Sequence, residues 1–507
     1  MTAKAMEQLL SRMGEHSERV TVINPATGKI SLELPQFTHA ETLAAGMAAR
    51  DVAADSGWAT LQARQRAQVL LNLHDLMAEH REHILDLIQF ETGKSRGAAF
   101  EDFAGGLFAA RHYGKKAPKL LRARRMPTDA PLFVRNYLEY APMGLVGVIT
   151  PWNFPCALPC FDVLPALAAG NAVLHKVDNQ VALTGLFIRD LAEQAGLPVG
   201  LWQVVAGSGP EAGNGVTDAA DYVAFTGSTT TGRLVAERAA ARLIPYSLEL
   251  GGKNPAIVLP GADLKRAADI VVAAATSNAG QVCVGIERCL VPDDRVDEMV
   301  EILDATIGRL SFGKGSKFDT DMGGMVSENQ FNRVSGMVNQ ARSKGFAVLR
   351  GQARPEFGPF FLEPAIVVEP NDAADLHRSE VFGPVIQVYG YQSIDEAVVA
   401  ANDSEFGLNA SVIGPTTEAM AVARRLEAGS VNINDGFRAS FGSMASPMGG
   451  VKRSGIGRRN GDNGLLRFTQ PKAIGVATGL FKLPTRASQY RVIAPLLVTL
   501  SRVLRRL

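Results

Sequence analysis

Apolar and polar positions between residues 143 and 233 follow two alternating periodicities. Short apolar runs typical of buried strands, such as GLVGVIT (144–150) and DYVAFTG (221–227), are separated by helical patterns such as ALTGLFIRDLAEQAG (182–196). This alternation is typical of βαβ units, in which a parallel sheet carries helices on both faces. Ligands of such a doubly wound sheet bind beyond the carboxyl ends of its strands.

A second series of the same kind follows Pro255. The strand patterns AIVL, ERCLV, PAIVV and VIQVYG are interleaved with helical patterns at 262–280 and about 294–310. Residues 120–142 and 465–479 belong to neither series, and their strand-like alternation predicts a small projecting sheet used in oligomerisation. We therefore expect an α/β fold with two doubly wound parallel-sheet domains, residues 1–119 with 143–253 and residues 254–464, followed by a tail at 480–507.

The length of 507 residues agrees with more than one domain, because single hydrophobic cores stop growing near about 250–300 residues. No window approaches the roughly 20 apolar residues of a membrane-spanning helix. The first residues, MTAKAMEQLLSRMGEH, lack the apolar run of a secretory signal, and four unevenly spaced cysteines argue against a disulfide framework. We therefore expect a cytoplasmic protein, and the net charge of +1 excludes nucleic acid as a partner.

The segment Gly227–Gly232 has the glycine spacing of a P-loop, but Arg233 stands where Lys-Ser/Thr must follow. This excludes an NTPase. A strand that opens a helix nevertheless offers free N–H groups to the pyrophosphate of a dinucleotide. His80 and His83 lie on a charged helical pattern far from any cysteine, and the cysteines lack zinc spacing, so we expect a nucleotide site and no metal site.

The segment SNAGQVCVGIERC (277–289) places Cys283 directly after a helical pattern and between Gly280 and Gly285. A lone buried cysteine is usually a small core residue. The separate segment SLELGGKNP, however, places Glu249 in an apolar strand, where desolvation raises the pKa of a carboxyl group toward that of a general base. A thiolate, a base and a dinucleotide site together suggest covalent redox chemistry.

The chain resembles the NAD(P)-dependent aldehyde dehydrogenase superfamily from VINPATGK near its start to MGGVKRSGIGRRNG near its end. The motifs that carry the resemblance occur in the order ETGK, TPWNFP, PALAAGNAV, FTGS, LELGGKNP, NAGQVC, EVFGPV, NDSEFGLNASV and SPMGGVKRSG. Within the superfamily the chain is most similar to bacterial succinate-semialdehyde dehydrogenases. The resemblance implies that residues 1–119 with 143–253 bind the coenzyme, that 254–464 form the catalytic domain, and that the enzyme is a homodimer or homotetramer.

The resemblance also implies residue roles in the oxidation of an aldehyde to a carboxylic acid. Cys283 matches the nucleophile that forms a thiohemiacetal and then a thioester. Asn153 and the backbone N–H of Cys283 match the donors to the oxyanion, and Glu249 matches the base that activates water. A coenzyme-A-acylating relative would not need that base, and a non-catalytic relative would need none of the three side chains.

The same resemblance implies a coenzyme site formed by Thr150, Pro151, Trp152, Lys176, Asn179, Gly227, Ser228, Glu380 and Phe382. At the position of Asn179, relatives commonly carry a glutamate that would repel the 2′-phosphate of NADP. Its absence favours NADP or the use of both NADP and NAD, with His175 or Lys176 as the phosphate partner.

The implied substrate tunnel is lined by Phe154, Ala157, Leu158, Phe161, Val282, Val284, Arg438 and Phe441. Succinate-semialdehyde enzymes often carry an arginine at the position of Ser277, and without it a buried carboxylate loses its charge partner. Arg438 is the candidate replacement. Succinate semialdehyde and a medium- or long-chain apolar aldehyde therefore both remain open as the small-molecule substrate.

The tail is basic, since residues 463–507 contain eight Lys and Arg and no Asp or Glu. Pro495 predicts the start of an amphipathic helix of about 13 residues. Its apolar face carries Leu496, Leu497, Leu500, Val503, Leu504 and Leu507, and its other side carries Arg502, Arg505 and Arg506. Such a helix either packs on its own or a partner subunit, or makes a peripheral contact with an anionic membrane surface.

Overall fold

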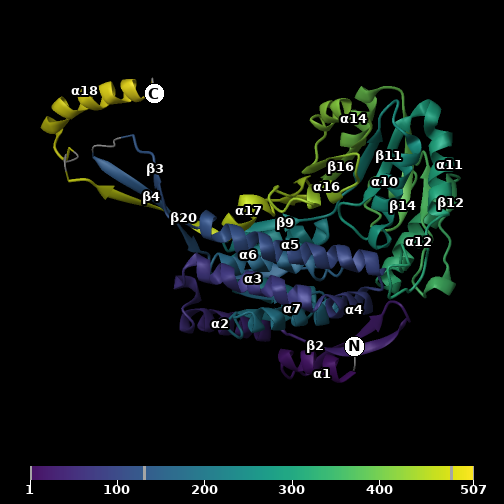
Figure 1. Cartoon of the computed structure of the whole chain (residues 1–507), viewed down its shortest axis with the longest axis horizontal. Helices are drawn as coiled ribbons and strands as arrows, with labels where there is room; N and C mark the ends of the chain where they lie inside the picture. The colour runs from purple at the N-terminus through teal and green to yellow at the C-terminus, as the bar shows by residue number, and fades with distance from the viewer. Residues whose placement is uncertain (1–2, 130–132, 480–483, 506–507) are drawn as a thin grey trace.

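The computed structural model describes residues 3–129, 133–479 and 484–505 (Figure 1). It contains two parallel-sheet units, a small antiparallel sheet and a C-terminal helix, which confirms the expected α/β fold class. The N-terminal residues form α1 (Ala3–Leu10), which packs against the first unit, and a hairpin of β1 (Glu18–Asn24) and β2 (Lys29–Gln36).

The first sheet has six strands in the order β19 (Gly455–Ile456), β9 (Tyr246–Glu249), β8 (Tyr222–Thr226), β5 (Leu145–Ile149), β6 (Ala172–Lys176) and β7 (Trp202–Val205). Of these strands, β19 alone is antiparallel to its neighbour. Every residue of β5 is buried, as expected for a central strand covered on both faces. Because β19 follows the second sheet in sequence, the chain returns to the first sheet beside Glu249.

Helices cover both faces of this sheet. One face carries α6 (Ala157–Ala168) and α7 (Ala182–Gln194), and beyond them α3 (Ala63–Glu79), α4 (Arg81–Thr92) and α5 (Arg96–Leu120). The other face carries α2 (His39–Asp55), α8 (Asn214–Ala219) and α9 (Thr229–Ala241). Gly170 and Gly196 end α6 and α7 with φ values of 98° and 107°, which glycine adopts without strain.

The second sheet has seven strands in the order β12 (Ala347–Arg350), β13 (Ala365–Val368), β14 (Val385–Tyr391), β11 (Ile286–Pro292), β10 (Asn254–Val258), β16 (Asn409–Ile413) and β17 (Ser430–Ile433). They are parallel except β12, which pairs antiparallel with β13. The helices of this unit are α10 (Leu264–Thr276), α11 (Val296–Ile307), α12 (Glu328–Ser343), α13 (Asp375–Arg378), α14 (Ile394–Asn402), α15 (Thr416–Ala423) and α16 (Arg438–Phe441). The short strands β15 (Phe406–Gly407) and β18 (Val451–Lys452) pair with each other, and α17 (Gly461–Leu466) packs on α5 and α6 of the first unit.

A three-stranded antiparallel sheet projects from the body (Figure 1). It consists of β3 (Arg124–Met126), β4 (Val134–Pro142) and β20 (Thr469–Ala477), with β4 in the centre. These strands lie in the two segments for which a projecting sheet is expected. Most residues of β20 are exposed, so its outer edge is open to a further strand.

The C-terminal helix α18 (Ala487–Leu504) lies beyond the projecting sheet and away from the body (Figure 1). The expected start at Pro495 is wrong. The helix begins at Ala487 because the side chain of Gln489 accepts hydrogen bonds from the backbone N–H groups of Thr485 (2.8 Å) and Arg486 (3.1 Å) and so caps the first turn. The side chains of Leu504, Arg506 and Leu507 lie outside the described part of the chain, in which no helix is long and apolar enough to cross a membrane.

Candidate active site

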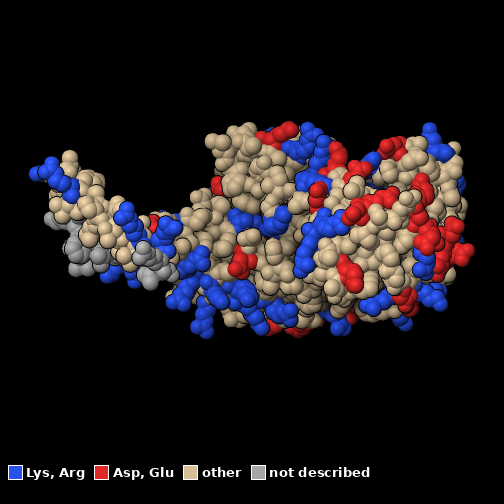
Figure 2. All heavy atoms as spheres, turned by 90° about the horizontal axis from the view of Figure 1, so that it is seen from above, with Lys and Arg blue, Asp and Glu red and all other residues tan. Residues whose placement is uncertain are grey.

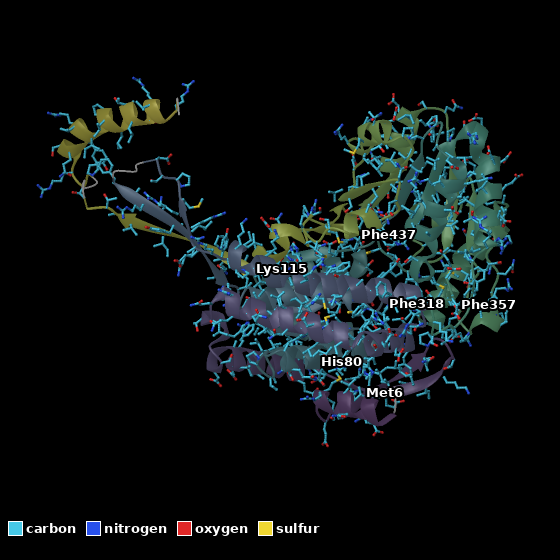
Figure 3. All side chains as sticks on the ribbon, viewed as in Figure 1. Met6, His80, Lys115, Phe318, Phe357 and Phe437 are labelled. Carbon is cyan, nitrogen blue, oxygen red and sulfur yellow. The ribbon has the colours of Figure 1, made fainter. Side chains whose placement is uncertain are left out.

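Cys283 lies where two cavities meet. A cavity of about 370 Å³, here called the groove, is lined by Pro151, Trp152, Asn153, Thr226, Gly227, Ser228, Glu249, Leu250, Gly251, Cys283, Gln330, Arg333, Glu380 and Phe382. A cavity of about 210 Å³, here called the tunnel, is lined by Glu101, Ala104, Gly105, Phe108, Phe154, Ala157, Leu158, Phe161, Val282, Cys283, Val284, Phe437, Arg438, Phe441, Gly442, Met444 and Met448. Phe437, in the tunnel wall, lies where the two sheet units meet (Figure 3). Because Cys283 lines both cavities, molecules in the groove and in the tunnel can both reach its sulfur.

The loop that presents Cys283 has an unusual backbone. After α10 ends, Asn278, Ala279 and Gly280 have φ values of 49°, 53° and 72°, in the left-handed region. A Cβ atom on Gly280 would overlap the carbonyl group of Gly383, so only glycine allows the two loops to pack this closely. The segments NAGQVC and EVFGPV are thereby held side by side.

The segment LELGGKNP holds the same loop from the other side. Glu249 ends β9, and a Cβ atom on Gly252 would lie 2.7 Å from the backbone oxygen of Cys283. The side-chain amide of Asn254 donates hydrogen bonds to the carbonyl oxygens of Cys283 (2.8 Å) and Gly285 (2.7 Å). The glycine pair therefore allows Glu249 and the cysteine loop to come together.

Burial controls the protonation of both reactive groups. Glu249 is 5% exposed, and burial raises its pKa to about 7, although the nearby Arg459 guanidinium lowers it. Burial also raises the pKa of the Cys283 thiol to about 12, and the carboxylates of Glu380 and Glu249 act in the same direction. In the resting site Cys283 is therefore a thiol, which must lose its proton to act as the expected thiolate nucleophile. Cys289, on β11, is fully buried and lines neither cavity.

Asn153 is fixed by its neighbours in the PWNFP turn. Its backbone oxygen accepts hydrogen bonds from Nζ of Lys94 (2.6 Å) and from the amide of Asn278 (3.1 Å). Its own side-chain amide donates to the carbonyl oxygen of Gln281 at 3.1 Å, which uses one of its two N–H groups. Asn153 and Cys283 line the same cavity.

The groove has the features that a dinucleotide requires. Gly227 and Ser228 lie at the N-terminus of α9, where free N–H groups and the helix dipole favour a pyrophosphate. Trp152 and Phe382, which both line the groove, pack edge to face with ring centroids 5.6 Å apart. Glu380 accepts a hydrogen bond from the backbone N–H of Gly252 at 3.0 Å. These residues fit the coenzyme that the resemblance implies.

Three of the expected coenzyme residues do not line the groove. Thr150 is buried at the end of β5, where its hydroxyl bonds to Nε2 of His175 (2.8 Å). Asn179 donates to the side chain of Gln36 (3.2 Å) and accepts from the backbone N–H of Gly207, and the half-buried Lys176 ends β6.

His175 does not serve as a cationic phosphate partner. It is fully buried, and burial lowers the pKa of its imidazole to about 3, so the ring is neutral. Of the two candidate phosphate partners, only Lys176 remains.

The tunnel brings together all eight residues expected to line it, and a further wall that the sequence did not indicate. The additional wall comes from α5 and consists of Glu101, Ala104, Gly105 and Phe108. Ala104, Gly105 and Phe108 follow Glu101 by three, four and seven positions, which is the spacing of one helix face. This spacing is visible in the sequence, but a helix face has the same pattern whether it covers a core or a cavity. The groove gains Gln330 and Arg333 from α12 in the same way.

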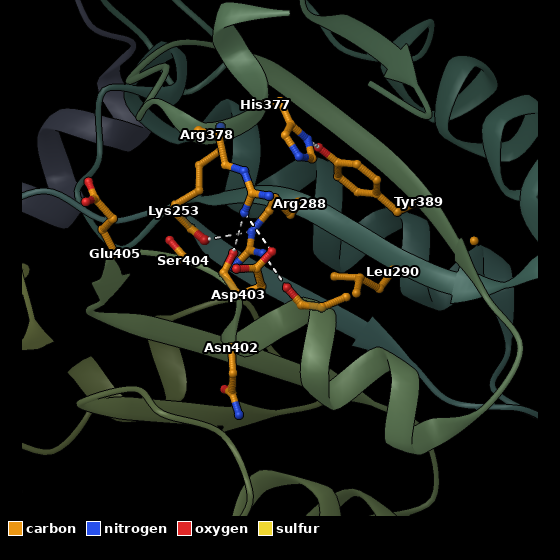
Figure 4. Close-up of a pocket in the computed structure, with 12 residues that line it drawn as sticks. Lys253, Arg288, Leu290, His377, Arg378, Tyr389, Asn402, Asp403, Ser404 and Glu405 are labelled. Atoms are coloured by element: carbon orange, nitrogen blue, oxygen red, sulfur yellow. Dashed lines mark hydrogen bonds and ion pairs between the residues drawn. The ribbon is translucent and has the colours of Figure 1, made fainter. Parts of the chain in front are cut away.

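Another cavity, of about 620 Å³, lies in the second unit and contains neither Cys283 nor Glu249 (Figure 4). The Arg288 guanidinium in its wall donates to the carbonyl oxygens of Lys253, Ala400 and Ala401. Because its donors hold the protein's own backbone, this arginine has a structural role.

Residues 12–474 match the family model described as Aldehyde dehydrogenase family. A protein of Mycolicibacterium smegmatis named "Putative succinate-semialdehyde dehydrogenase (NADP(+))" is 42% identical over 475 residues, which cover 93% of this chain and 90% of that protein. The crystal structure of NAD-dependent aldehyde dehydrogenase from Sinorhizobium meliloti has a TM-score of 0.88 at 29% identity, covering 93% of this chain and 94% of the other. The crystal structure of Mycobacterium tuberculosis aldehyde dehydrogenase complexed with NAD+ has a TM-score of 0.87 at 30% identity, covering 94% of this chain and 99% of the other.

Proposed function

The chain belongs to the aldehyde dehydrogenase family, and we propose that this NAD(P)-dependent aldehyde dehydrogenase works through Cys283, Glu249 and Asn153. The observation that carries the proposal is that Cys283 lines both cavities while Glu249 and Asn153 line the groove beside it. The net reaction converts an aldehyde, NAD(P)+ and water into a carboxylic acid, NAD(P)H and a proton.

The first step forms a bond between the sulfur of Cys283 and the aldehyde carbon. The thiol is neutral at rest, so its proton is released to solvent as the bond forms, and this is the proton that appears among the products. The carbonyl oxygen gains the negative charge. The free N–H of the Asn153 amide and the backbone N–H of Cys283 stabilise it.

The bound coenzyme supplies the hydride acceptor for the second step. Loss of hydride from the adduct leaves a thioester on Cys283. Glu249 then takes a proton from water as the water attacks the thioester carbon. The carbon–sulfur bond breaks, and the leaving sulfur of Cys283 takes up that proton, which restores the thiol and the carboxylate. A carboxyl group with a pKa of about 7 can accept this proton near neutral pH.

NADP and NAD are both proposed as coenzymes. The M. smegmatis relative is named for NADP(+), and the M. tuberculosis structure is a complex with NAD+. At the position of Asn179 relatives commonly carry a glutamate that would repel the 2′-phosphate of NADP, and this chain lacks that charge; Lys176, at the end of β6, would supply a cation. We therefore expect NADP to be accepted at least as well as NAD.

Succinate semialdehyde is the substrate that we propose to test first, because the M. smegmatis relative carries that name at 42% identity. Arg438 is the cation that would meet its carboxylate, since it lines the tunnel together with Cys283. The assay follows the absorbance of reduced nicotinamide with and without coenzyme A. No signal with any aldehyde and either coenzyme would overturn the enzyme proposal, and a strict need for coenzyme A would replace hydrolysis with acyl transfer.

We propose that the projecting sheet joins copies of the chain in a homodimer or homotetramer. Among the described residues β20 is an edge strand of this sheet, so the backbone groups on its outer side can pair with a strand of a second copy. Light scattering should give a multiple of the 54.1 kDa chain mass. A monomer at working concentration would contradict this assignment.

We propose that α18 makes a peripheral contact with an anionic membrane surface. Arg491, Arg502 and Arg505 project from one side of the helix, opposite Leu496 and Val503, and both apolar side chains are more than half exposed. Lys and Arg gather around the helix and the projecting sheet, whereas Asp and Glu are concentrated at the opposite end of the molecule (Figure 2). This combination suits the interface of anionic lipids.

The membrane proposal is tested by flotation with phosphatidylserine vesicles. The full chain should float and a chain ending at Thr485 should not, while both remain equally active. Equal flotation would eliminate the membrane contact, and a change in subunit number on truncation would indicate packing against a second copy.

A further inference from the structure

One ion pair lies in the tunnel wall. Arg438, at the start of α16, donates to Glu101 of α5 through Nε (2.8 Å) and through a terminal guanidinium nitrogen (2.7 Å). The hydroxyl of Ser277 donates to the other oxygen of the same carboxylate at 3.0 Å. Glu101 therefore connects Arg438 to Ser277, the position at which many succinate-semialdehyde enzymes carry an arginine.

This pair marks the outer end of the tunnel. The side chains of Arg438 and Glu101 are 44% and 32% exposed, whereas Phe161 and Leu158 in the same wall are 1% and 6% exposed. Among the described residues that line the tunnel, Arg438 is the one with a positive charge, and Glu101 the one with a negative charge. The tunnel entrance consequently offers almost no net charge to an incoming anion.

We propose that Glu101 is a specificity-determining residue that competes with a substrate carboxylate for Arg438. An aldehyde with a distal carboxylate must displace Glu101 or share the guanidinium with it, and the two carboxylates repel each other. A neutral aldehyde of the same length enters without disturbing the pair. Glu101 therefore lowers the affinity for semialdehyde acids and leaves that for neutral aldehydes unchanged. This inference rests on the proposed function.

The substitution Glu101→Gln tests the proposal because it removes the charge and keeps the shape. For succinate semialdehyde, KM should fall about tenfold with kcat unchanged, which corresponds to about 1.4 kcal/mol of binding. For butanal, both constants should stay within about twofold. In an Arg438→Gln background, Glu101→Gln should have no further effect, since the contested cation is gone.

A binding measurement separates this inference from the proposed activity. Calorimetry with succinate and with butyrate compares a ligand that has a distal carboxylate with one that lacks it. Glu101→Gln should lower the Kd for succinate about tenfold and leave the Kd for butyrate unchanged, even if the wild-type chain oxidises no aldehyde. The control Glu298→Gln breaks a similar exposed pair, 2.7 Å from Arg295, and should alter neither ligand.

Two results would overturn the inference. If the ratio of kcat/KM for succinate semialdehyde to kcat/KM for butanal is the same in Glu101→Gln as in the wild type, Glu101 does not compete for Arg438. If Glu101→Gln lowers kcat/KM equally for both substrates and the affinity equally for both ligands, while thermal unfolding is normal, Glu101 only supports the tunnel wall.

Discussion

Replacement of Glu249 by glutamine removes a buried carboxylate without changing the volume of the side chain. In the native protein the pKa of Glu249 is raised from 4.5 to about 7, chiefly by desolvation, and the residue is 5% exposed. At about 1.4 kcal/mol per pKa unit, ionisation of Glu249 costs the folded state about 3 kcal/mol. The same desolvation that prepares the base therefore destabilises the fold.

The pH dependence has a definite sign. Because the native pKa is raised, the favourable contribution of the protonated group is complete below pH 4.5 and is lost as pH rises through about 7. The Glu249→Gln variant has no group to ionise, so it should match the wild type near pH 4 and be more stable by about 3 kcal/mol at pH 8.5. Thermal unfolding at both pH values should show a Tm higher by several degrees only at the alkaline pH.

The Glu249→Gln variant should lose activity although it gains stability at alkaline pH. With Glu249→Gln, the steady-state rate should fall by about 10²–10⁴-fold, while a burst of reduced nicotinamide remains because thioester formation precedes hydrolysis. Stopped-flow absorbance separates the two phases. A normal steady-state rate would remove Glu249 from the mechanism, and a variant no more stable than the wild type at pH 8.5 would refute the desolvation argument.

The remaining predictions concern residues around the same centre. Asn153→Ala should lower kcat by about 10²–10³-fold with coenzyme affinity unchanged in a fluorescence titration, since only the oxyanion loses a donor; a parallel loss of coenzyme binding would contradict that role. Lys176→Ala should raise KM for NADP about tenfold and KM for NAD little, as initial rates would show, and equal effects would exclude Lys176 as the phosphate partner. Arg459→Met should lower the free energy of unfolding in urea by about 3–5 kcal/mol, because Arg459 pairs with the buried Asp162. It should also move the pH–rate profile to higher pH, because Arg459 lowers the pKa of Glu249. An unmoved profile would refute this coupling.

The sheets could be predicted because their signals are local. Buried strands and amphipathic helices differ in period, so the alternation along the chain identifies each βα unit without knowledge of its neighbours.

The start of α18 could not be predicted in this way, because it depends on a side-chain cap. Proline favours a first turn, but Gln489 caps the chain at Thr485 and Arg486, and Pro495 lies inside the helix at the loss of one N–H donor.

The site was predicted least well where a residue's role depends on distant partners. Burial of His175 beside Thr150 makes its imidazole neutral, and nothing in the strand pattern distinguishes it from an exposed histidine. The Glu101–Arg438 contact joins α5 to α16 across the tunnel, so neither segment alone indicates it. The protonation state of Cys283 likewise depends on Glu249 and the loops around it.

The central claim is that the substrate becomes covalently attached to Cys283. Wild-type enzyme mixed with succinate semialdehyde and NADP+ and quenched within the burst should carry one acyl group per subunit, located by peptide mass spectrometry on Cys283. The matched variant Cys289→Ala, which changes a buried thiol of β11, should give the same adduct, and Cys283→Ala should give neither adduct nor reduced coenzyme while still binding NADP+. An adduct on another cysteine, or turnover by Cys283→Ala, would contradict the account.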